Sequence, residues 1–264
     1  MIGRKSPPAG RVERNGFRWR GTEVSRLEAL SDAVFGFAIT LLVVSLEVPR
    51  TYGQLMEAMR GFWTFAVTFA VLFMVWLNQY RWFRRYGLED GITILLNALL
   101  LFVIVYFVYP LKFVFGLVVE LLLGQGNRAR LPDGSTVPIF TAADQGMKMM
   151  LVFGAGYVAV FGLFALMYAH AWRRRDELEL NELERWDTRD NLRETLLNVG
   201  IGILSMIVAV RVNAMLGGLT YALIGPALTI HGIVSGAGRR RLERGLAAEA
   251  SPAQPVSSPA AGGG

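Results

Sequence analysis

The sequence contains no cysteine, so neither disulfide bonds nor thiolate metal sites are available to it. Histidine is almost as scarce, because only His170 and His231 occur. Each stands alone near the end of an apolar segment, where an interfacial or helix-packing role is expected more than a ligand or proton-relay role. The sequence shows no histidine cluster, no paired intramembrane carboxylates and no nucleophile beside a base. We therefore expect no catalytic residue, no metal site and no cofactor.

Charged residues are also few, which distinguishes this chain from an ordinary soluble protein. Charged residues make up 18% of the 264 residues and hydrophobic residues 53%, and the mean hydropathy is +0.39. This composition is too apolar for an ordinary soluble domain and predicts an integral membrane protein. The formal net charge is +6, but the basic residues lie between apolar segments and not in one block, so no nucleic acid partner is expected. The first apolar run has no small-x-small cleavage site and should be retained as a helix.

Six apolar segments predict an all-α membrane protein with six transmembrane helices. At roughly 1.5 Å per residue each segment reaches across a hydrocarbon core of about 30 Å, the shortest only marginally. Open β-structure is excluded in lipid, since every backbone group there must be paired. Residues 112–123 either lengthen the third helix beyond Pro110 or lie at the membrane interface. The six segments are 30–48, 57–80, 92–111, 146–171, 195–212 and 216–236.

The segments between these helices define the topology. Most of the 27 lysine and arginine residues fall on one side of the predicted membrane, which places both termini in the cytoplasm. We expect residues 1–29 to form a basic cytoplasmic arm, 30–245 a six-helix transmembrane domain, and 246–264 a disordered tail. The linker 173–194 reads as a charged helical hairpin or helix extension, mainly a solvated connector. The loop 124–145 has turn residues at 132–134 and belongs outside.

The first apolar segment carries the most informative chemistry. Ser31 and Asp32 stand at the mouth of an otherwise apolar helix. An ionised carboxylate costs roughly 2.5–3.5 kcal/mol at the centre of a membrane helix, less towards its end, so such a group usually marks a packed polar network or an ion path.

Helical periodicity places five further residues of this segment on one face. If copies of the helix surround an axis, that face presents stacked rings of side chains. The alternative is that Phe37 only packs and that Thr40 bonds to a carbonyl of its own helix. The five residues are Ala33, Phe37, Thr40, Val44 and Glu47.

The same stretch resembles a known family of potassium channels. Arg26, Ser31 and Asp32 match the signature R-x-x-x-F-S-D, with Leu30 in place of the phenylalanine, and the blocks 33–35, 38–43 and 48–49 are also similar. This signature opens the first membrane helix of the lysosomal and endosomal potassium-channel family. One copy is present, so the chain resembles the bacterial, single-repeat form. Looser similarity continues at residues 76–78, 81–83, 90, 97, 99–101 and 110, although Asn78-Gln79-Tyr80 replaces a stretch that often carries a histidine.

The resemblance implies a homotetramer whose first helices line a central pore that conducts potassium passively. Phe37 takes the position of a branched aliphatic residue that forms a hydrophobic constriction, and Thr40 takes that of a threonine associated with potassium preference. Ala33, Val44 and Glu47 would complete the pore lining, and Glu47 as a ring at the outer mouth is our own inference. The implied partners are other copies of the chain, the bilayer and permeant monovalent cations. The implied location is the inner (plasma) membrane, which the chain would cross several times.

The signature residues are expected to form a polar network. Arg26, Ser31 and Asp32 would tie the first helix to the second and third at the cytoplasmic end. The candidate partners are Trp76, Asn78, Arg81 and Asn97.

A secondary transporter remains the alternative to a channel. Transporters typically show internal repeats and helices broken at mid-membrane around polar residues. Mid-membrane charges are absent here, and support for this alternative is limited to the helix-breaking residues Gly200, Gly202, Gly217, Gly218 and Pro226.

Overall fold

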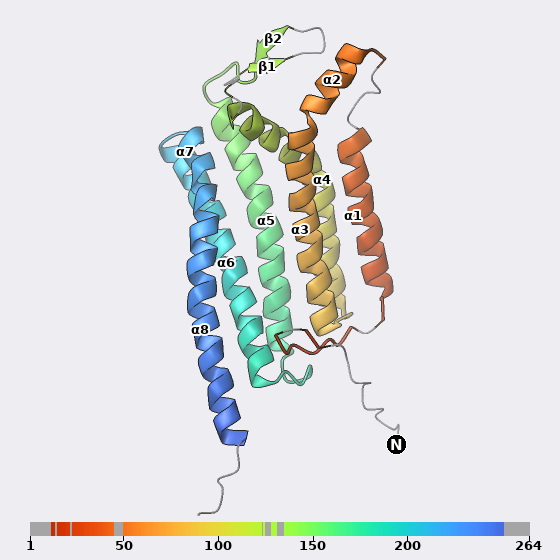
Figure 1. Ribbon diagram of the computed structural model, residues 1–264, viewed down its shortest axis with the longest axis vertical. Coiled ribbons are helices and arrows are strands. Elements are labelled where there is room, and N and C mark those ends of the chain that lie inside the picture. Colours follow the sequence, from red (N-terminus) through yellow and green to blue (C-terminus); the bar gives the residue numbers. More distant parts are fainter. Residues whose placement is uncertain are drawn as a thin grey trace, which may run out of the picture.

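The computed structural model describes residues 12–13, 15–21, 23–44, 50–122, 124, 128–130 and 135–250. Its long helices run side by side in one elongated bundle (Figure 1). We call the end that carries the described residues before Arg26 the arm end, and the end that carries the two short strands the hairpin end. The elements are α1 (Arg26–Val44), α2 (Tyr52–Arg60), α3 (Phe62–Tyr86), α4 (Gly91–Leu122), β1 (Arg128–Arg130), β2 (Thr136–Pro138), α5 (Gln145–Arg173), α6 (Glu182–Arg211), α7 (Ala214–Leu219), a 3-10 helix (Thr220–Leu223) and α8 (Ile224–Ala250).

Five helical segments of the described residues are long and apolar enough to cross a membrane. They are α3, α4, α5, α6 and the segment 214–249 that contains α7 and α8. These account for five of the six predicted segments. The remaining one, 30–48, corresponds to α1, which ends at Val44, and residues 45–49 lie outside the described residues.

The helices begin and end at positions that differ from the ends of the apolar segments. The predicted segment 57–80 is divided at Gly61, where α2 ends and α3 begins. α3 then continues to Tyr86 and is closed by Gly87, whose φ of 57° is left-handed and suits glycine. α4 runs without interruption through Pro110 to Leu122, so residues 112–122 lengthen the third predicted segment. Proline removes one backbone hydrogen bond, and the last part of α4 leans across the hairpin end (Figure 1).

The charged linker is more ordered than expected. α5 ends at Arg173 and α6 begins at Glu182, with Asn181 and Glu184 forming a capping box. The helix-extension reading is therefore correct for residues 182–194. The expectation of a solvated connector is wrong for Glu184, Asp187 and Thr188, which are all buried because the arm and neighbouring helices cover them.

Two features differ from the sequence predictions. β1 and β2 pair antiparallel, with Ala129 opposite Val137, in a small hairpin that none of the five apolar segments includes. The predicted turn at 132–134 lies outside the described residues. α8 extends to Ala250, beyond the predicted start of the tail, and residues 251–264 lie outside the described residues.

α4 contributes much of the buried core. Leu100 and Val108 are fully buried, as is Met167 of α5. α4 and α5 approach closely at Gly156, where an added Cβ would lie 2.0 Å from Cε1 of Phe107. α1 in turn packs against α4 and α3.

Candidate functional site

α1 has one face against the bundle and one face without neighbours in the single chain. Phe35, Ala38 and Leu42 are at most 1% exposed and belong to the core shared with α3 and α4. Phe37 is 59% exposed, and Ala33 and Thr40 are also exposed. α1 therefore turns these three pore-lining candidates away from its own bundle. The side chain of Val44 and the whole of Glu47 lie outside the described residues.

Thr40 bonds within its own helix. Its Oγ1 donates a hydrogen bond to the carbonyl oxygen of Phe37 at 2.7 Å, as the alternative reading of this residue supposed. This bond uses the hydroxyl hydrogen and leaves oxygen lone pairs on an exposed side chain. The Thr40 oxygen thus keeps the capacity to accept a donor or to contact a cation.

A buried relay of side chains links α1, α4 and α3. Asn97 donates from Nδ2 to Oγ of Ser31 at 2.9 Å, and Ser31 donates to the carbonyl of Leu27 at 2.8 Å. Gln79 donates from Nε2 to Oδ1 of Asn97 at 2.5 Å. Ser31, Gln79 and Asn97 are each at most 1% exposed. Buried polar groups that satisfy each other in this way fix the position of one helix against its neighbours.

Asp32 makes a second link between α1 and α3. Trp76 donates from Nε1 to Oδ1 of Asp32 at 2.7 Å. The Trp76 ring lies in a row of α3 aromatics, 5.3 Å from the ring of Phe73 and 5.6 Å from that of Tyr80. The aromatic row thus supports the donor that holds the carboxylate.

The structure brings together only part of the predicted network. Arg26 and Arg81 are exposed, and among the described residues neither bonds to this cluster. Asn78 instead accepts a hydrogen bond from Oη of Tyr168 on α5 at 3.2 Å. Sequence reasoning missed Gln79, although the stretch that replaces the family's histidine contains it. Its place three residues after Trp76, on a neighbouring part of the helix surface, is the signal that could have found it.

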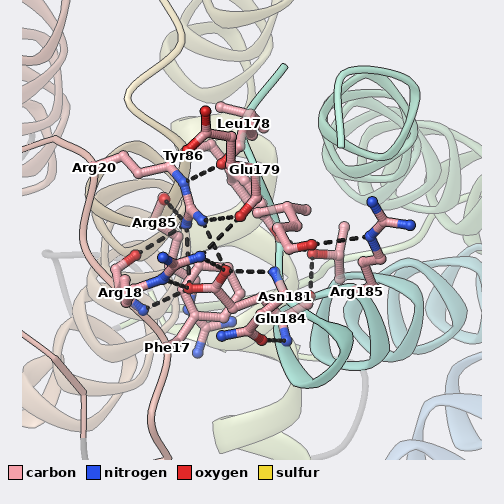
Figure 2. A network of polar contacts seen from close by, with 12 residues as sticks. Phe17, Arg18, Arg20, Arg85, Tyr86, Leu178, Glu179, Asn181, Glu184 and Arg185 are labelled. Atoms are coloured by element: carbon pink, nitrogen blue, oxygen red, sulfur yellow. Dashed lines mark hydrogen bonds and ion pairs between the residues drawn. The ribbon is translucent and has the colours of Figure 1, made fainter. Parts of the chain in front are cut away.

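The arm crosses the end of the bundle and holds α6 by two arginines. Figure 2 shows Arg18 and Arg20 converging on Glu184, the carboxylate of the α6 capping box. The shortest distances to Oε2 of Glu184 are 2.9 Å from Nη2 of Arg18 and 2.7 Å from Nη2 of Arg20. Phe17, which is fully buried, packs edge-on against Tyr86 with ring centroids 5.8 Å apart.

The arm is also tied to α3. Glu13 accepts from Arg85 at 2.8 Å, and Arg84 donates to the carbonyl of Gly21 at 3.0 Å. Partial burial raises the pKa of Glu13, but the hydrogen bond and charge of Arg85 outweigh burial and hold this pKa below its usual value. The arm therefore joins the beginning of α1 to α3 and α6, which the basic composition of residues 1–29 did not predict.

A third polar cluster joins the beginning of α4 to the end of α5. Asp90 lies 2.8 Å from Nε2 of His170 and 3.1 Å from Nη2 of Arg174, and it accepts a 2.5 Å hydrogen bond from Thr93. Burial raises the pKa of Asp90, but the bonds from Thr93 and the charge of His170 outweigh it, so this pKa lies below its usual value. His170 is buried in this cluster, in keeping with the packing role expected for it.

Comparisons with known proteins agree with this arrangement. Residues 26–107, which include α1 and the polar relay, match the family described as endosomal/lysosomal potassium channel TMEM175. A potassium channel of Marivirga tractuosa is 35% identical over 233 residues, which are 86% of this chain and 93% of that protein. The chain belongs to this family.

Two further potassium channels are similar to this chain, one over a shorter and one over a comparable length. A potassium channel of Chamaesiphon minutus is 34% identical over 98 residues, 34% of this chain and 48% of that protein. The crystal structure of a variant of the potassium channel MtTMEM175, bound to a nanobody–MBP fusion protein, superposes with a TM-score of 0.74. The two chains are 32% identical, and the match covers 86% of this chain and 99% of that one. The family confirms a multi-pass membrane channel as the class, and not an enzyme or a transporter.

Proposed function

We propose that the protein conducts potassium ions passively, in preference to sodium, through a pore on the axis of a homotetramer. α1 of each copy lines the pore, and the permeant ion needs no cofactor. The observation that carries the proposal is the outward face of α1, where Phe37 is 59% exposed and Thr40 and Ala33 are exposed beside it. A symmetric assembly around this face covers it and surrounds the axis with identical side chains.

The proposed topology has six transmembrane helices, namely α1 and the five apolar segments, with both termini in the cytoplasm of the inner (plasma) membrane. The arm end carries arginines from the arm, α3, the α5–α6 connection and α8. An excess of basic residues at one end of a helical bundle supports the cytoplasmic placement of that end.

The rings of the proposed pore have distinct tasks. Four phenylalanines at position 37 form an apolar constriction that gates by excluding water. Four Thr40 oxygens replace part of the hydration shell of a passing cation without holding it tightly. Ala33 and Val44 line the wall, and Glu47 concentrates cations at the outer mouth.

The polar contacts at the arm end hold the pore helix in register. The buried relay joins Ser31, Asn97 and Gln79, and the Trp76–Asp32 bond adds a second link to α3. Such contacts fix the rotation of α1 about its own axis, which decides whether Phe37 or its neighbours point to the centre. The role we assign to Ser31 and Asp32 is therefore positioning, with Arg26 outside the network.

The proposal is tested by potassium flux through purified protein in liposomes, with a sodium gradient as comparison. Wild-type protein should pass K⁺ faster than Na⁺. Phe37→Ala should raise the K⁺ flux, because it opens the constriction. The matched control is Phe102→Ala, which truncates a phenylalanine that is 67% exposed and belongs to α4, not to the proposed pore helix.

Increased flux in Phe37→Ala with unchanged flux in Phe102→Ala supports a constriction at Phe37. If neither the wild type nor Phe37→Ala shows passive flux although both are incorporated into the liposomes, the protein is not a conducting channel. Equal K⁺ and Na⁺ flux in the wild type contradicts the assigned preference.

A further inference from the structure

A groove runs between α6 and α8 towards the arm end of the bundle. The two helices lie side by side in Figure 1, and the groove between them has a volume of about 530 Å³. Its wall combines arginines, an aromatic ring and aliphatic side chains. The lining residues that matter here are Trp186, Asp190, Arg193, His231, Val234 and Arg241.

The two arginines of this groove differ from many others at the arm end. Arg20 and Arg85 are paired with carboxylates, and Arg239 of α8 is paired with Asp187. Arg193 and Arg241 are exposed, and among the described residues neither forms an ion pair or hydrogen bond. The groove therefore holds two guanidinium groups that are free to bind an anion.

The groove contains one carboxylate among its lining residues, and this carboxylate has a partner. Oδ1 of Asp190 lies 3.0 Å from Nε2 of His231 across the groove. Because two arginines and one carboxylate line the groove, its charge balance is positive.

The groove spans the stretch of the bundle in which α6 and α8 each change from charged to apolar. α6 is charged up to Glu194 and apolar from Leu196 onwards, whereas α8 is apolar up to Ala237 and basic from Arg239. Val234 is 67% exposed and Ile233 65%, on the apolar side of this boundary. In a membrane protein such a boundary falls at the level of the lipid headgroups, where tryptophan is also favoured.

We propose that this groove binds an anionic phospholipid, with its phosphate between Arg193 and Arg241 and an acyl chain along Ile233 and Val234. A basic pocket between membrane helices at the headgroup level has the chemistry that recognises such lipids. Arginine forms two parallel hydrogen bonds to a phosphate, which adds geometry to charge. This inference rests on the membrane insertion of α6 and α8 and does not depend on conduction.

The test is native mass spectrometry of the purified protein in detergent, titrated with phosphatidylglycerol and, separately, with phosphatidylcholine. The variant Arg193→Gln/Arg241→Gln removes both free cations. Each arginine near an anionic headgroup contributes roughly a fivefold gain in binding, so the affinity for phosphatidylglycerol should fall about 30-fold. Phosphatidylcholine should bind weakly to both proteins.

The matched control is Arg173→Gln/Arg244→Gln. It removes the same charge from two exposed arginines of α5 and α8 that do not line the groove and form no ion pair among the described residues. This control should bind phosphatidylglycerol like the wild type. Thermal unfolding of all three proteins without lipid verifies that both variants fold.

Several outcomes would overturn the inference. Equal losses in the groove variant and the control mean that overall charge, not the groove, attracts the lipid. Unchanged binding in the groove variant places the lipid elsewhere. Binding of glycerol 3-phosphate as tight as that of phosphatidylglycerol means that the apolar wall has no part, and the occupant is then a free phosphate.

Discussion

At the scale of single residues, α1 has one face buried against the bundle and an opposite face that is exposed. Phe35 and Phe37 are two positions apart, yet one is 1% and the other 59% exposed. A helix turns by about 100° per residue, so positions two apart lie on nearly opposite sides. The inward residue anchors α1 to the bundle, and the outward residue is left for the proposed assembly.

The side chain of Thr40 is expected to affect ion selectivity. Its hydroxyl hydrogen is bonded to the carbonyl of Phe37, so the oxygen of this exposed side chain is left as an acceptor. Thr40→Val should lower the ratio of K⁺ to Na⁺ flux several-fold because it removes this oxygen, whereas Thr40→Ser should retain most of the ratio. The measurement is the flux ratio in liposomes.

The control for Thr40 is Thr229→Val on α8. Thr229 is also exposed, and its hydroxyl donates in the same way to the carbonyl of Gly225 at 2.8 Å. An unchanged ratio is expected for this variant. A wild-type ratio in Thr40→Val would remove Thr40 from the selectivity assignment.

At the scale of elements, two clusters connect segments that are distant in sequence. The arm is joined to α6 through Glu184, and α4 is joined to α5 through Asp90. Each cluster lies at an end of a helix, where backbone groups and side chains are both available for hydrogen bonds. We therefore expect these contacts, more than helix propensity, to determine the stability of the arm end.

Glu184 gives a prediction for the arm. Its side chain is 1% exposed and faces Arg18 and Arg20, which are 49% and 18% exposed. Breaking a buried pair costs about 3–5 kcal/mol, and the exposure of Arg18 reduces this, so Glu184→Ala should lower the free energy of unfolding by about 2–3 kcal/mol. Thermal unfolding in detergent and proteolysis of residues 12–25 measure the effect.

Glu182→Ala is the control for Glu184. Glu182 is an exposed acidic residue of the same first turn of α6, so the charge at the helix start changes equally. A small effect is expected. Equal destabilisation in the two variants would show that the helix terminus, and not the arm, accounts for the loss.

Asp90 gives a prediction for pH. Its pKa is lower in the folded protein than in the unfolded chain, where an aspartate titrates near 3.9, so it stabilises the fold above about pH 4. This stability is lost as the pH falls through the folded pKa. Asp90→Asn should therefore be less stable than the wild type at pH 7 and should lose less stability on acidification.

The thermal unfolding midpoint between pH 7 and pH 3 measures the effect of Asp90. Glu89→Gln is the control, since Glu89 is exposed and forms no ion pair among the described residues. A parallel pH dependence in Asp90→Asn and wild type would contradict the role of this carboxylate.

At the scale of the whole molecule, α1 and α8 lie on opposite sides of the bundle (Figure 1). The proposed pore axis runs beside α1, and the proposed lipid groove lies between α6 and α8. The two proposed sites therefore lie at separate surfaces of the bundle, and each can be altered without changing the other.

The absence of cysteine allows a direct test of the assembly. Phe37→Cys places one thiol per chain on the outward face of α1, so oxidation in membranes should give disulfide-linked dimers, which gel electrophoresis detects. Native mass spectrometry of the unmodified protein should give four copies. Ile230→Cys is the control, because Ile230 is 63% exposed on α8, far from the proposed axis. Monomers in both experiments would contradict a central position of α1.

The apolar runs and the signature around Asp32 were enough to predict a helical membrane protein of this channel family, because hydrophobic length and a short motif are local properties. They also placed Phe37 and Thr40 on one face, since helical periodicity is local as well. The structure alone decided that Gln79 joins the relay, that Glu184 is buried beneath the arm, and that Arg193 and Arg241 share a groove. These relations join residues far apart in the chain, and only tertiary packing determines which distant side chains meet.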